Sequence, residues 1–387
     1  MNIDYVEIRS AENRELIAII DTANSVIWQT VYFGVGEFEI YCRATKETVD
    51  CLKRGNYVTR PDDDECGIIE NIVITTDENG FKMITASGRF VKSLLDRRVI
   101  FTATIDGSGN EYVWRVPPIT LSGKVEEAAR KLVTDNIINP VMTARAADII
   151  ELDALAGYPD VIVVKDSEGE TDADKQTELQ NLLTYTDALL QEYNMSAAMR
   201  LDYDTLKFKY KVFKGKDFSI DNTDGNEPIV FSKDYDNLLT NEYDESEDGQ
   251  KNTAIIGGEG EGLERYFAFS NAGNAGLARR ETFIDAKGIS RTYKDENDIE
   301  KTYTLGVYRK MLEAQGSQTL STMKPNITFS GKVDLVSTHL TYRADFNIGD
   351  IVTIQDNELG IYTNARILTV LEVQDEDGYS IELGFGY

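Results

Sequence analysis

A chain of 387 residues with 41% hydrophobic and 28% charged residues is long enough for several globular domains, and its composition excludes a disordered protein. Asp and Glu total 67 against 40 Lys and Arg, a formal net charge of -27, so the surface repels nucleic-acid phosphates and anionic lipids. Stable binding to DNA or to a membrane is therefore not expected.

The cysteines and the N-terminus indicate a chain made and kept in a reducing cytoplasm. Cys42, Cys51 and Cys66 are odd in number and lack CxxC spacing, which argues against both a disulfide framework and a zinc site. We expect them to be reduced and partly buried. The N-terminus has no signal-peptide pattern, and no apolar run is long enough to span a bilayer.

The first predicted domain, residues 1–118, has an antiparallel β pattern. Short alternating or β-branched runs such as Gly36–Tyr41 and Ile72–Thr75 are separated by turns rich in Gly and Asp. Pro117 and Pro118 end the pattern, because proline interrupts regular structure. We expect a β-barrel-like domain here.

The second predicted segment, residues 119–215, is an inserted α/β region. A stripe after a Ser122 cap predicts a first helix at Val125, Ala128, Ala129, Leu132 and Val133. The capping-box-like Thr171–Asp174 precedes a second helical stripe at Leu179, Leu182, Leu183, Leu189, Leu190 and Tyr193. The alternation in Leu206–Val212 predicts a strand with lysines on one face, which faces solvent or an acidic neighbour.

The remaining chain returns from mixed to β structure. Residues 216–325 are predicted to be a mixed β/α region that completes the second half, with a helix through Leu305, Tyr308, Met311 and Leu312. The acidic run Asp244–Asp248 is expected to be a solvated loop. Residues 326–387 are predicted to form the second β-barrel-like unit, which makes the fold class α+β, mainly β.

An internal repeat is the most informative feature of the sequence. Ile69–Gly88 aligns without a gap to Ile367–Gly386, and both copies centre on Asp-Glu, then Asn or Asp, then Gly and an aromatic residue. Asn-Gly and Asp-Gly supply the positive φ angles of hairpin turns. Each copy is therefore predicted to be a hairpin with the same register.

The repeat extends upstream of the hairpins. Gly55–Thr59 matches Gly349–Thr353, and Asp64–Ile68 matches Asn357–Ile361, before a five-residue insertion in the second copy. Two similar units in one chain suit a ring in which each subunit fills two equivalent places. Three chains would present six such units, since closed rotational symmetry is common among homo-oligomers.

Several short stretches resemble the tail-tip or baseplate hub proteins of long-tailed phages, and the N-terminal hub part of tail-associated lysins. They are Val35–Ile40, Gly67–Glu70, Ser87–Arg89 with Leu94–Arg98, Lys251–Gly258 ending in Arg265, and Ile348–Gly386. They occur in the expected order over nearly the whole chain. Hub domains of contractile tails, pyocin-like particles and type VI secretion spikes are also similar, so the resemblance leaves the type of machine open.

The resemblance implies a homotrimer in which two barrel domains per chain form a pseudo-sixfold ring. Such a ring would join a sixfold tail-tube or distal tail protein to a threefold spike, fibre or lysin, and would contact the C-terminus of a tape-measure protein. DNA would pass only transiently through its lumen, and the chain itself would not bind membrane. The expected location is the tip of a virion tail that is assembled in the host bacterial cytoplasm.

No catalytic, cofactor-binding or metal-binding residue is predicted, and the chain is predicted not to be an enzyme. The one histidine, His339, is insufficient for the common triads and zinc motifs, and is expected to be a core or interface residue. The glycine run Gly257–Gly262 lacks the Lys-Ser/Thr of a phosphate loop and is expected to be a flexible connection. Asp221–Glu227 lacks the spacing of a calcium loop and is expected to be a solvated turn.

Two alternatives remain at this point. A carbohydrate-binding or receptor-binding tail component would line a groove with exposed aromatics, and the 20 tyrosines allow it. A tail-associated peptidoglycan hydrolase would require a pair of carboxylates in a catalytic arrangement, which sequence proximity among 67 acidic residues does not reveal. The acidic run could also line a lumen and keep DNA from adhering.

Overall fold

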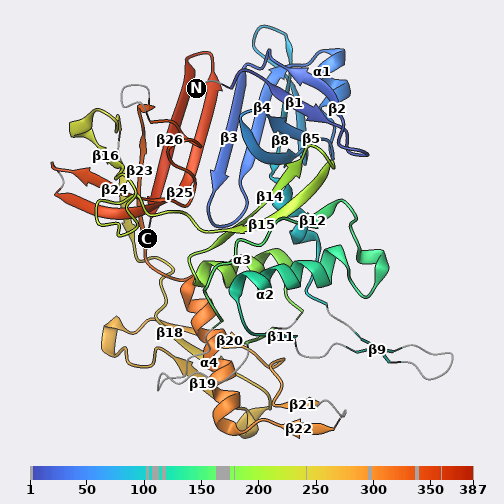
Figure 1. The fold of residues 1–387 in the computed structure, drawn as a ribbon, viewed down its shortest axis with the longest axis vertical. Helices are drawn as coiled ribbons and strands as arrows, with labels where there is room; N and C mark the ends of the chain where they lie inside the picture. Colours follow the sequence, from blue (N-terminus) through green and yellow to red (C-terminus); the bar gives the residue numbers. More distant parts are fainter. Residues whose placement is uncertain are drawn as a thin grey trace.

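The computed structural model describes residues 3–101, 104–106, 113–115, 119–162, 175–177, 179–240, 242–294, 299–335, 340–358 and 360–386. Figure 1 shows the two largest sheets and the short helix α1 (Lys46–Cys51) in the upper half, and the longer helices with the smaller sheets below. Both the first strands and the last strands of the chain lie in the upper half, side by side.

The largest sheet has ten strands and contains both ends of the repeat. Eight strands form a continuous series: β17 (Glu242–Ser246), β23 (Asn326–Lys332), β26 (Gly378–Gly386), β25 (Ile361–Asp375), β3 (Ser25–Val31), β4 (Glu37–Arg43), β8 (Lys82–Arg89) and β7 (Asn71–Thr76). Two more strands extend from β25 as a branch: β24 (Ile351–Asp356) and β16 (Val230–Ser232). Most of the series is antiparallel, as expected for strands joined by hairpins.

A seven-stranded sheet joins the N-terminal strands to the middle of the chain. Its order is β12 (Ile150–Leu152), β15 (Lys207–Phe213), β14 (Ser196–Asp202), β6 (Asp63–Ile68), β5 (Tyr57–Arg60), β1 (Val6–Arg9) and β2 (Leu16–Ile20). The predicted lysine strand is confirmed as β15, in which Phe208, Tyr210 and Val212 are buried. Its lysines form ion pairs within the chain, Lys207 with Glu151 and Lys209 with Asp202.

In the part of the chain that the structure describes, the lower half holds three of four α-helices and four small sheets. The described helices are α1 (Lys46–Cys51), α2 (Val125–Val133), α3 (Leu182–Glu192) and α4 (Leu305–Ser321). A three-stranded sheet comprises β19 (Phe267–Ser270), β18 (Thr253–Gly257) and β20 (Glu281–Asp285). The strand pairs are β9 (Thr104–Asp106) with β10 (Val113–Arg115), β11 (Ile119–Leu121) with β13 (Lys175–Thr177), and β21 (Thr292–Lys294) with β22 (Glu300–Thr302).

The predicted helices are confirmed, but their caps differ from the prediction. Lys124, not Ser122, precedes α2 and makes no side-chain cap, whereas Asn181 caps α3 by accepting a hydrogen bond from the Thr184 amide. The proposed capping box at Thr171–Asp174 lies outside the described residues. Asn181 satisfies one of the free amides that begin every helix, so α3 starts later than the apolar periodicity suggested.

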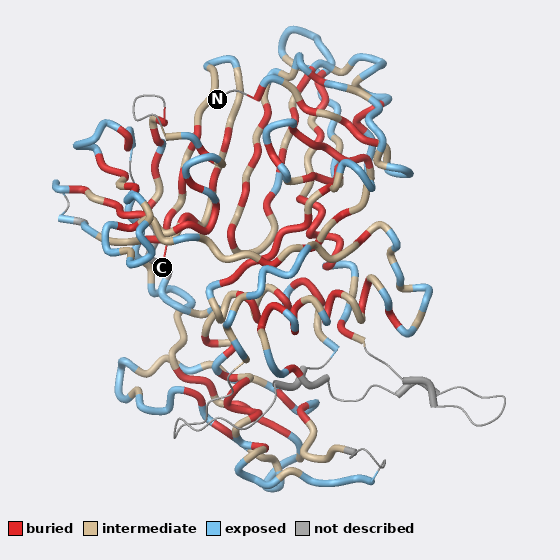
Figure 2. Tube along the Cα trace, in the orientation of Figure 1, coloured by how far each residue is buried: buried red, intermediate tan, exposed pale blue. Residues whose placement is uncertain are grey.

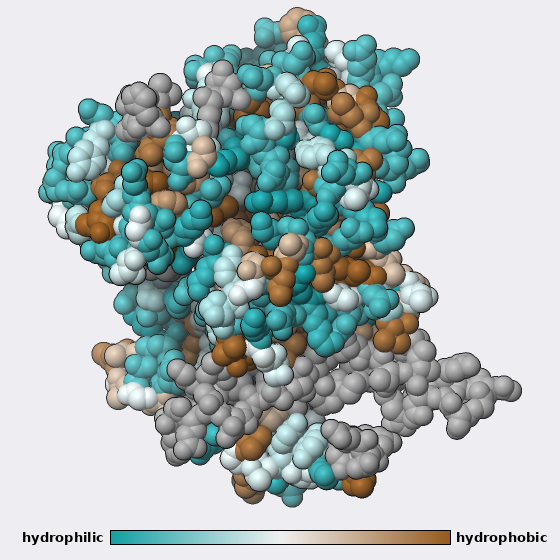
Figure 3. All heavy atoms as spheres, viewed as in Figure 1, coloured by the Kyte–Doolittle hydropathy of each residue, from teal (hydrophilic) through white to brown (hydrophobic). Residues whose placement is uncertain are grey.

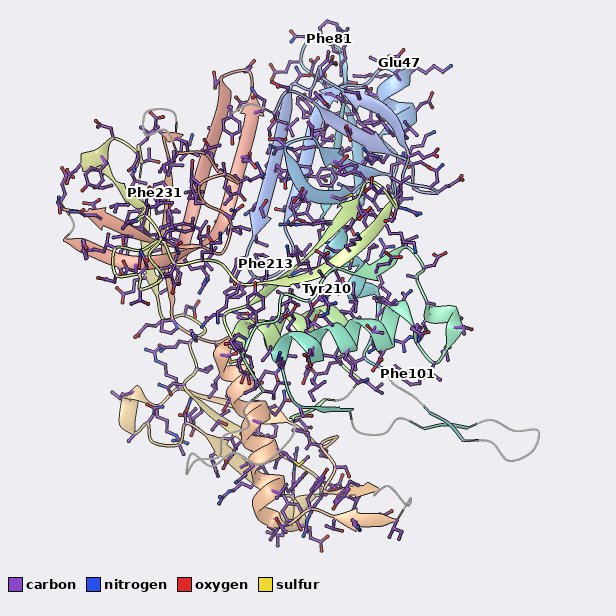
Figure 4. All side chains as sticks on the ribbon, in the orientation of Figure 1. Glu47, Phe81, Phe101, Tyr210, Phe213 and Phe231 are labelled. Carbon is purple, nitrogen blue, oxygen red and sulfur yellow. The ribbon has the colours of Figure 1, made fainter. Side chains whose placement is uncertain are left out.

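Four apolar cores hold these elements together, and Figure 2 shows buried segments in every layer. One core lies between α2, α3 and the seven-stranded sheet, and another beneath the C-terminal strands. A third lies under β3, β4 and β8, and the fourth under α4. All three cysteines are free, and they are buried rather than partly buried as expected. In Figure 4, Tyr210 and Phe213 mark β15, and Phe231 marks the C-terminal core.

The chain is mainly β, as predicted. Over the described residues every sheet retains unpaired edge strands, and none closes into a barrel, so the barrel-like arrangement of the two units stays a prediction. The expectation of a solvated loop at Asp244–Asp248 is wrong in its first half. Asp244, Glu245 and Ser246 belong to the edge strand β17, and the turn begins only after them.

Candidate functional site: the junction between two repeats in one sheet

The two repeats lie next to each other in the ten-stranded sheet. The order β7, β8, β4, β3 in the first unit corresponds to β25, β26, β23, β17 in the second. The sheet therefore consists of two four-stranded units in tandem, joined where β25 of the second unit pairs with β3 of the first (Figure 1). This junction is the feature that we consider functional.

The turn that precedes each unit has the same backbone hydrogen bonds. The Gly55 amide donates to the Ile69 carbonyl at 2.8 Å, and the Gly349 amide donates to the Ile367 carbonyl at 2.8 Å. Both glycines have φ near +90°, at +91° and +89°, a conformation that side chains with a Cβ rarely adopt. These bonds confirm that the sequence repeat is a structural repeat.

The residues after these glycines, Asn56 and Asp350, also have the same structural role in the two units. The side-chain oxygen Oδ1 of Asn56 accepts a hydrogen bond from the Ala11 amide at 2.9 Å, and Oδ1 of Asp350 accepts one from the Lys216 amide at 2.7 Å. In each unit an Asx side chain thus fixes a segment that arrives from elsewhere in the chain.

Both repeat hairpins are confirmed, but the prediction of a shared register is wrong by one residue. The Asp77 amide donates to the Phe81 carbonyl, which leaves three residues in the first turn, whereas Asp375 pairs directly with Gly378 and leaves two in the second. Figure 4 shows Phe81 at the top of the molecule, at the tip of the first hairpin. The same sequence pattern thus supports two turn lengths, and a bulge near Ile367 adds to the offset.

The junction itself is antiparallel and places one acidic side chain in the core. Thr369 pairs with Val31 at one end and Gln374 with Val26 at the other. Glu372 lies opposite Trp28, on the buried face of β25, and is only 1% exposed. A carboxylate without partners would be strongly destabilising at such a position.

Glu372 is held by two arginines from outside its own strand. Arg60 at the end of β5 is fully buried and approaches Glu372 with two nitrogens, at 3.2 and 3.3 Å. Arg343, from the loop before β24, donates to Oε2 of Glu372 at 2.5 Å and to Asp63 at 2.6 Å. Asp62 completes the pairing of Arg60, with contacts of 3.0 and 2.5 Å.

Aromatic groups enclose this cluster of ions. The Tyr379 hydroxyl donates to Glu372 at 2.9 Å, and the Trp28 indole donates to Asp63 at 2.6 Å. The guanidinium of Arg60 lies over the Trp28 ring, 5.4 Å from its centroid. The cluster therefore connects the two units through direct hydrogen bonds in a site that excludes most water.

Protonation equilibria in the cluster favour its charged form. Burial alone would raise the pKa of Glu372, but the charges of Arg60 and Arg343 outweigh burial and lower it. Burial likewise opposes ionisation of Asp62, yet its hydrogen bond with Arg60 lowers the pKa of that carboxyl. Burial and the nearby Glu372 raise the pKa of Tyr379, so its hydroxyl keeps the proton that it donates.

The two ends of the tandem series are unpaired. On β7, Val73 and Ile74 are 45% and 50% exposed, and on β17 four of five residues are exposed. Exposed edge strands carry free backbone donors and acceptors that can pair with another chain. The face seen in Figure 3 is otherwise mainly hydrophilic, which agrees with the high charge of the chain.

The segments considered for phosphate and calcium binding have structural explanations. A Cβ on Gly258 would lie 2.5 Å from the Tyr308 hydroxyl, and one on Gly257 would lie 2.6 Å from Arg265, so the glycines allow close packing. In the Asp221–Glu227 turn, the Asn222 side chain accepts hydrogen bonds from two following amides, as an Asx turn does.

The described part of the chain contains no cluster of three or more His, Cys, Asp or Glu side chains arranged to hold a metal ion. None of its helices combines the length and the apolarity needed to cross a membrane. His339, for which we expected a core or interface role, lies outside the described residues.

Comparison with known proteins identifies a matching family and proteins with a similar fold. The model of a family described as Siphovirus ReqiPepy6 Gp37-like protein matches residues 5–387. A tail protein from Neisseria meningitidis MC58 has a similar structure, with 13% identity, a TM-score of 0.53, and coverage of 98% of this chain and 95% of that protein. The 43 kDa tail protein of prophage MuSo2 from Shewanella oneidensis is also similar, at 13% identity, a TM-score of 0.50 and coverage of 99% and 98%. The search of curated proteins gave no match.

Proposed function

Because the chain belongs to the Siphovirus ReqiPepy6 Gp37-like family, we propose that it is a structural and non-enzymatic component of a phage tail, located at the tail tip as a hub. The observation that carries this proposal is the tandem sheet, in which two equivalent units are joined side by side and both ends stay unpaired. Its fold, shared with two tail proteins, agrees with a role in the virion.

The tandem sheet suggests how copies would assemble. Since β7 is the equivalent of β25, and β17 is the equivalent of β3, the β7 edge of one copy can pair with the β17 edge of the next copy, as β25 pairs with β3 within a chain. Such a contact is head-to-tail, and a rotation that closes produces a ring. Three copies would then give six equivalent units, a pseudo-sixfold trimer.

The pairing within the chain also predicts the register between chains. Val73 aligns with Leu371, which pairs with Gln29 of β3. The equivalent of Gln29 on β17 is Asp244, found by following pairings across both units from the aligned residues Asn71 and Thr369: Asn71 to Ser87 to Glu39 to Ile27, and Thr369 to Gly384 to Ser330 to Glu242. We therefore expect Val73 of one copy to lie opposite Asp244 of the next.

The ring would act as an adaptor between symmetries and as a passage. Six equivalent units match a sixfold tail-tube or distal tail protein above, and three chains match a threefold spike, fibre or lysin below, with a tape-measure C-terminus reaching the lumen. Tyr243 pairs with buried Phe329, so Glu242 and Asp244 project from the opposite face of β17. If that face lines the lumen, its charge would keep DNA from adhering during passage.

The test is to determine the stoichiometry and the contact together. Light scattering of the purified chain should give three times the chain mass of 43.4 kDa, and negative-stain images should show a ring with a sixfold outline. The double variant Val73→Cys/Asp244→Cys should form disulfides between copies under mild oxidation. Each single variant serves as the matched control and should remain uncrosslinked.

Two results would contradict the proposal. A stable dimer or tetramer would exclude the pseudo-sixfold ring. A trimer that forms no disulfide between cysteines at positions 73 and 244, while the control disulfide Ile27→Cys/Val373→Cys forms within each chain, would exclude the strand-edge contact. Ile27 and Val373 are paired across the junction, so their disulfide reports a correctly folded chain.

A further inference from the structure

We infer that the cluster of Arg60, Arg343 and Glu372 determines which hairpin the β3 edge accepts, and that it prevents the repeat hairpin of a second copy from replacing the chain's own C-terminal hairpin. The inference rests on the proposed assembly only in that copies must meet. It assigns a recognition role to a buried ion cluster that holds one junction of the sheet.

The risk of replacement follows from the repeat. Residues 71–76 of β7 align with residues 369–374 of β25, the segment that pairs with β3. The two segments place their side chains on corresponding faces, because Ile74 pairs with buried Ile84 and Glu372 pairs with buried Ile381. Backbone pairing alone does not distinguish two six-residue segments that run in the same direction, so the β7 strand of another copy can compete with residues 369–374 for β3.

The two hairpins differ at the positions that contact the cluster. Ile74 takes the place of Glu372 in the first repeat, and Phe81, which lacks a hydroxyl, takes the place of Tyr379. On the receiving side, Arg60 of the first unit corresponds to Ile354 of the second, which is fully buried. The charged hairpin therefore matches the charged receiving site, and the apolar hairpin matches the apolar receiving site.

Exchange of the hairpins would leave polar groups without partners. With Ile74 in place of Glu372, Nη1 of Arg60 would lose the acceptor that it has at 3.3 Å, and Nη2 of Arg343 would keep only Asp63. The displaced Glu372 would lose both arginines. Its remaining hydrogen bond would be the one from Tyr379, which lies on the same hairpin. Buried charges that lose partners are strongly unfavourable, which opposes the wrong pairing more than any backbone term.

The experiment uses two populations of the full chain that can form a disulfide only through the wrong pairing. One population carries Ile27→Cys on β3, and the other carries Thr75→Cys, the position that aligns with Val373 opposite Ile27. The populations are unfolded together, refolded as a mixture and oxidised mildly. With the cluster intact, we expect almost no disulfide between the two populations.

The comparison is the same mixture with the two arginines and their shared carboxylate replaced by Arg60→Ile, Arg343→Met and Glu372→Ile. Both hairpins then offer isoleucine and neither arginine remains to distinguish them, so we expect the mixed disulfide to increase by about tenfold. Equal yields with and without the cluster would overturn the inference. The native cysteines are buried and are present equally in all samples.

A milder variant keeps the test decisive if the triple variant does not fold. Tyr379→Phe copies the first repeat at one position and removes one hydrogen bond to Glu372, so the mixed disulfide should rise by a smaller factor, about twofold. No rise in Tyr379→Phe together with a folded chain would also overturn the inference. The Val73→Cys/Asp244→Cys pair, measured separately, reports the ring contact, so failure of the ring proposal is distinguishable from failure of this one.

Discussion

At the scale of single residues, Glu372 is the side chain on which the junction most depends. Its carboxylate accepts from Arg60, Arg343 and Tyr379 in a site with 1% exposure. Glu372→Ala should therefore lower the free energy of unfolding by about 3–5 kcal/mol, because two buried cations lose a shared partner. Urea denaturation measures this change. The matched control is Glu376→Ala in the exposed turn, which should change stability by less than about 0.5 kcal/mol.

The contribution of Glu65 to stability should change with pH in the opposite direction from that of an ordinary paired carboxylate. Burial, followed by the charge of Asp63, raises the pKa of Glu65 from 4.5 to about 7. Above pH 4.5 the unfolded chain releases this proton before the folded chain does, so stability falls as pH rises from 4.5 to 7 and then levels. Glu65→Gln should remove that part of the decline and stabilise the protein at pH 8 by up to about 3 kcal/mol.

The measurement for Glu65 is a series of denaturation curves between pH 4.5 and pH 8 for both proteins. A constant difference across this range would show that the substitution acts through packing and not through ionisation. Glu376→Gln is a suitable control, because Glu376 lies in the exposed turn of the second hairpin.

The ion cluster was not predictable from the sequence as a site. Arg60 and Glu372 are 312 positions apart, and neither lies in a recognisable motif. One signal was nevertheless present in the repeat alignment. Glu372 interrupts a stretch in which the other copy has Ile74, and a charge at a position that the repeat predicts to be buried indicates a partner elsewhere.

At the scale of elements, the two glycine turns before the repeats provide a matched pair of substitutions. Gly55 and Gly349 both have φ near +90°, so an added Cβ is strained in each. A Cβ on Gly349 would also lie 2.2 Å from the Tyr32 ring, whereas one on Gly55 would approach only the Ala11 methyl at 3.7 Å. Gly349→Ala should therefore cost about 1–3 kcal/mol more than Gly55→Ala.

Thermal unfolding of the two alanine variants compares these costs under the same conditions. Equal shifts in Tm would mean that backbone strain alone governs both turns and that Tyr32 moves aside. A larger shift for Gly349→Ala would confirm that this turn is packed against Tyr32, the residue that follows β3. The second unit would then depend on the first for its stability.

Most of the elements were predictable because local signals determine them. The Asp-Gly and Asn-Gly turns identified both hairpins, and the apolar periodicity identified α2, α3 and α4. The register of the second hairpin was not predictable, because the same turn residues allow loops of two or three residues. The strand β17 was missed because its residues Glu242–Ser246 are polar on both faces, which is typical of an edge strand and also of a loop.

At the scale of the whole molecule, the repeat predicted two related units but not how they are connected. Sequence similarity says which strands are equivalent, and it does not say which edges meet. The structure places the units in tandem through β25 and β3, so the junction within the chain becomes a template for contacts between chains. Partner choice at the remaining edges then depends on a few side chains of β7 and β17.

A charge series at Val73 tests assembly of the whole molecule. In the proposed contact Val73 lies opposite Asp244, so Val73→Glu places like charges opposite each other and should dissociate the trimer to the 43.4 kDa chain in light scattering. Val73→Lys should preserve it, because the lysine can pair with Asp244. Val73 is 45% exposed in the single chain, so neither change should lower its Tm by more than a few degrees.

Ile17→Glu provides the control for this series. Ile17 is 49% exposed on β2, which is also an edge strand, but it belongs to the seven-stranded sheet and not to the proposed contact. The trimer should tolerate this change. If Val73→Glu and Val73→Lys dissociated it equally, the contact would depend on the shape of Val73 and not on the charge of β17, and the register that we derive from β25 and β3 would be wrong.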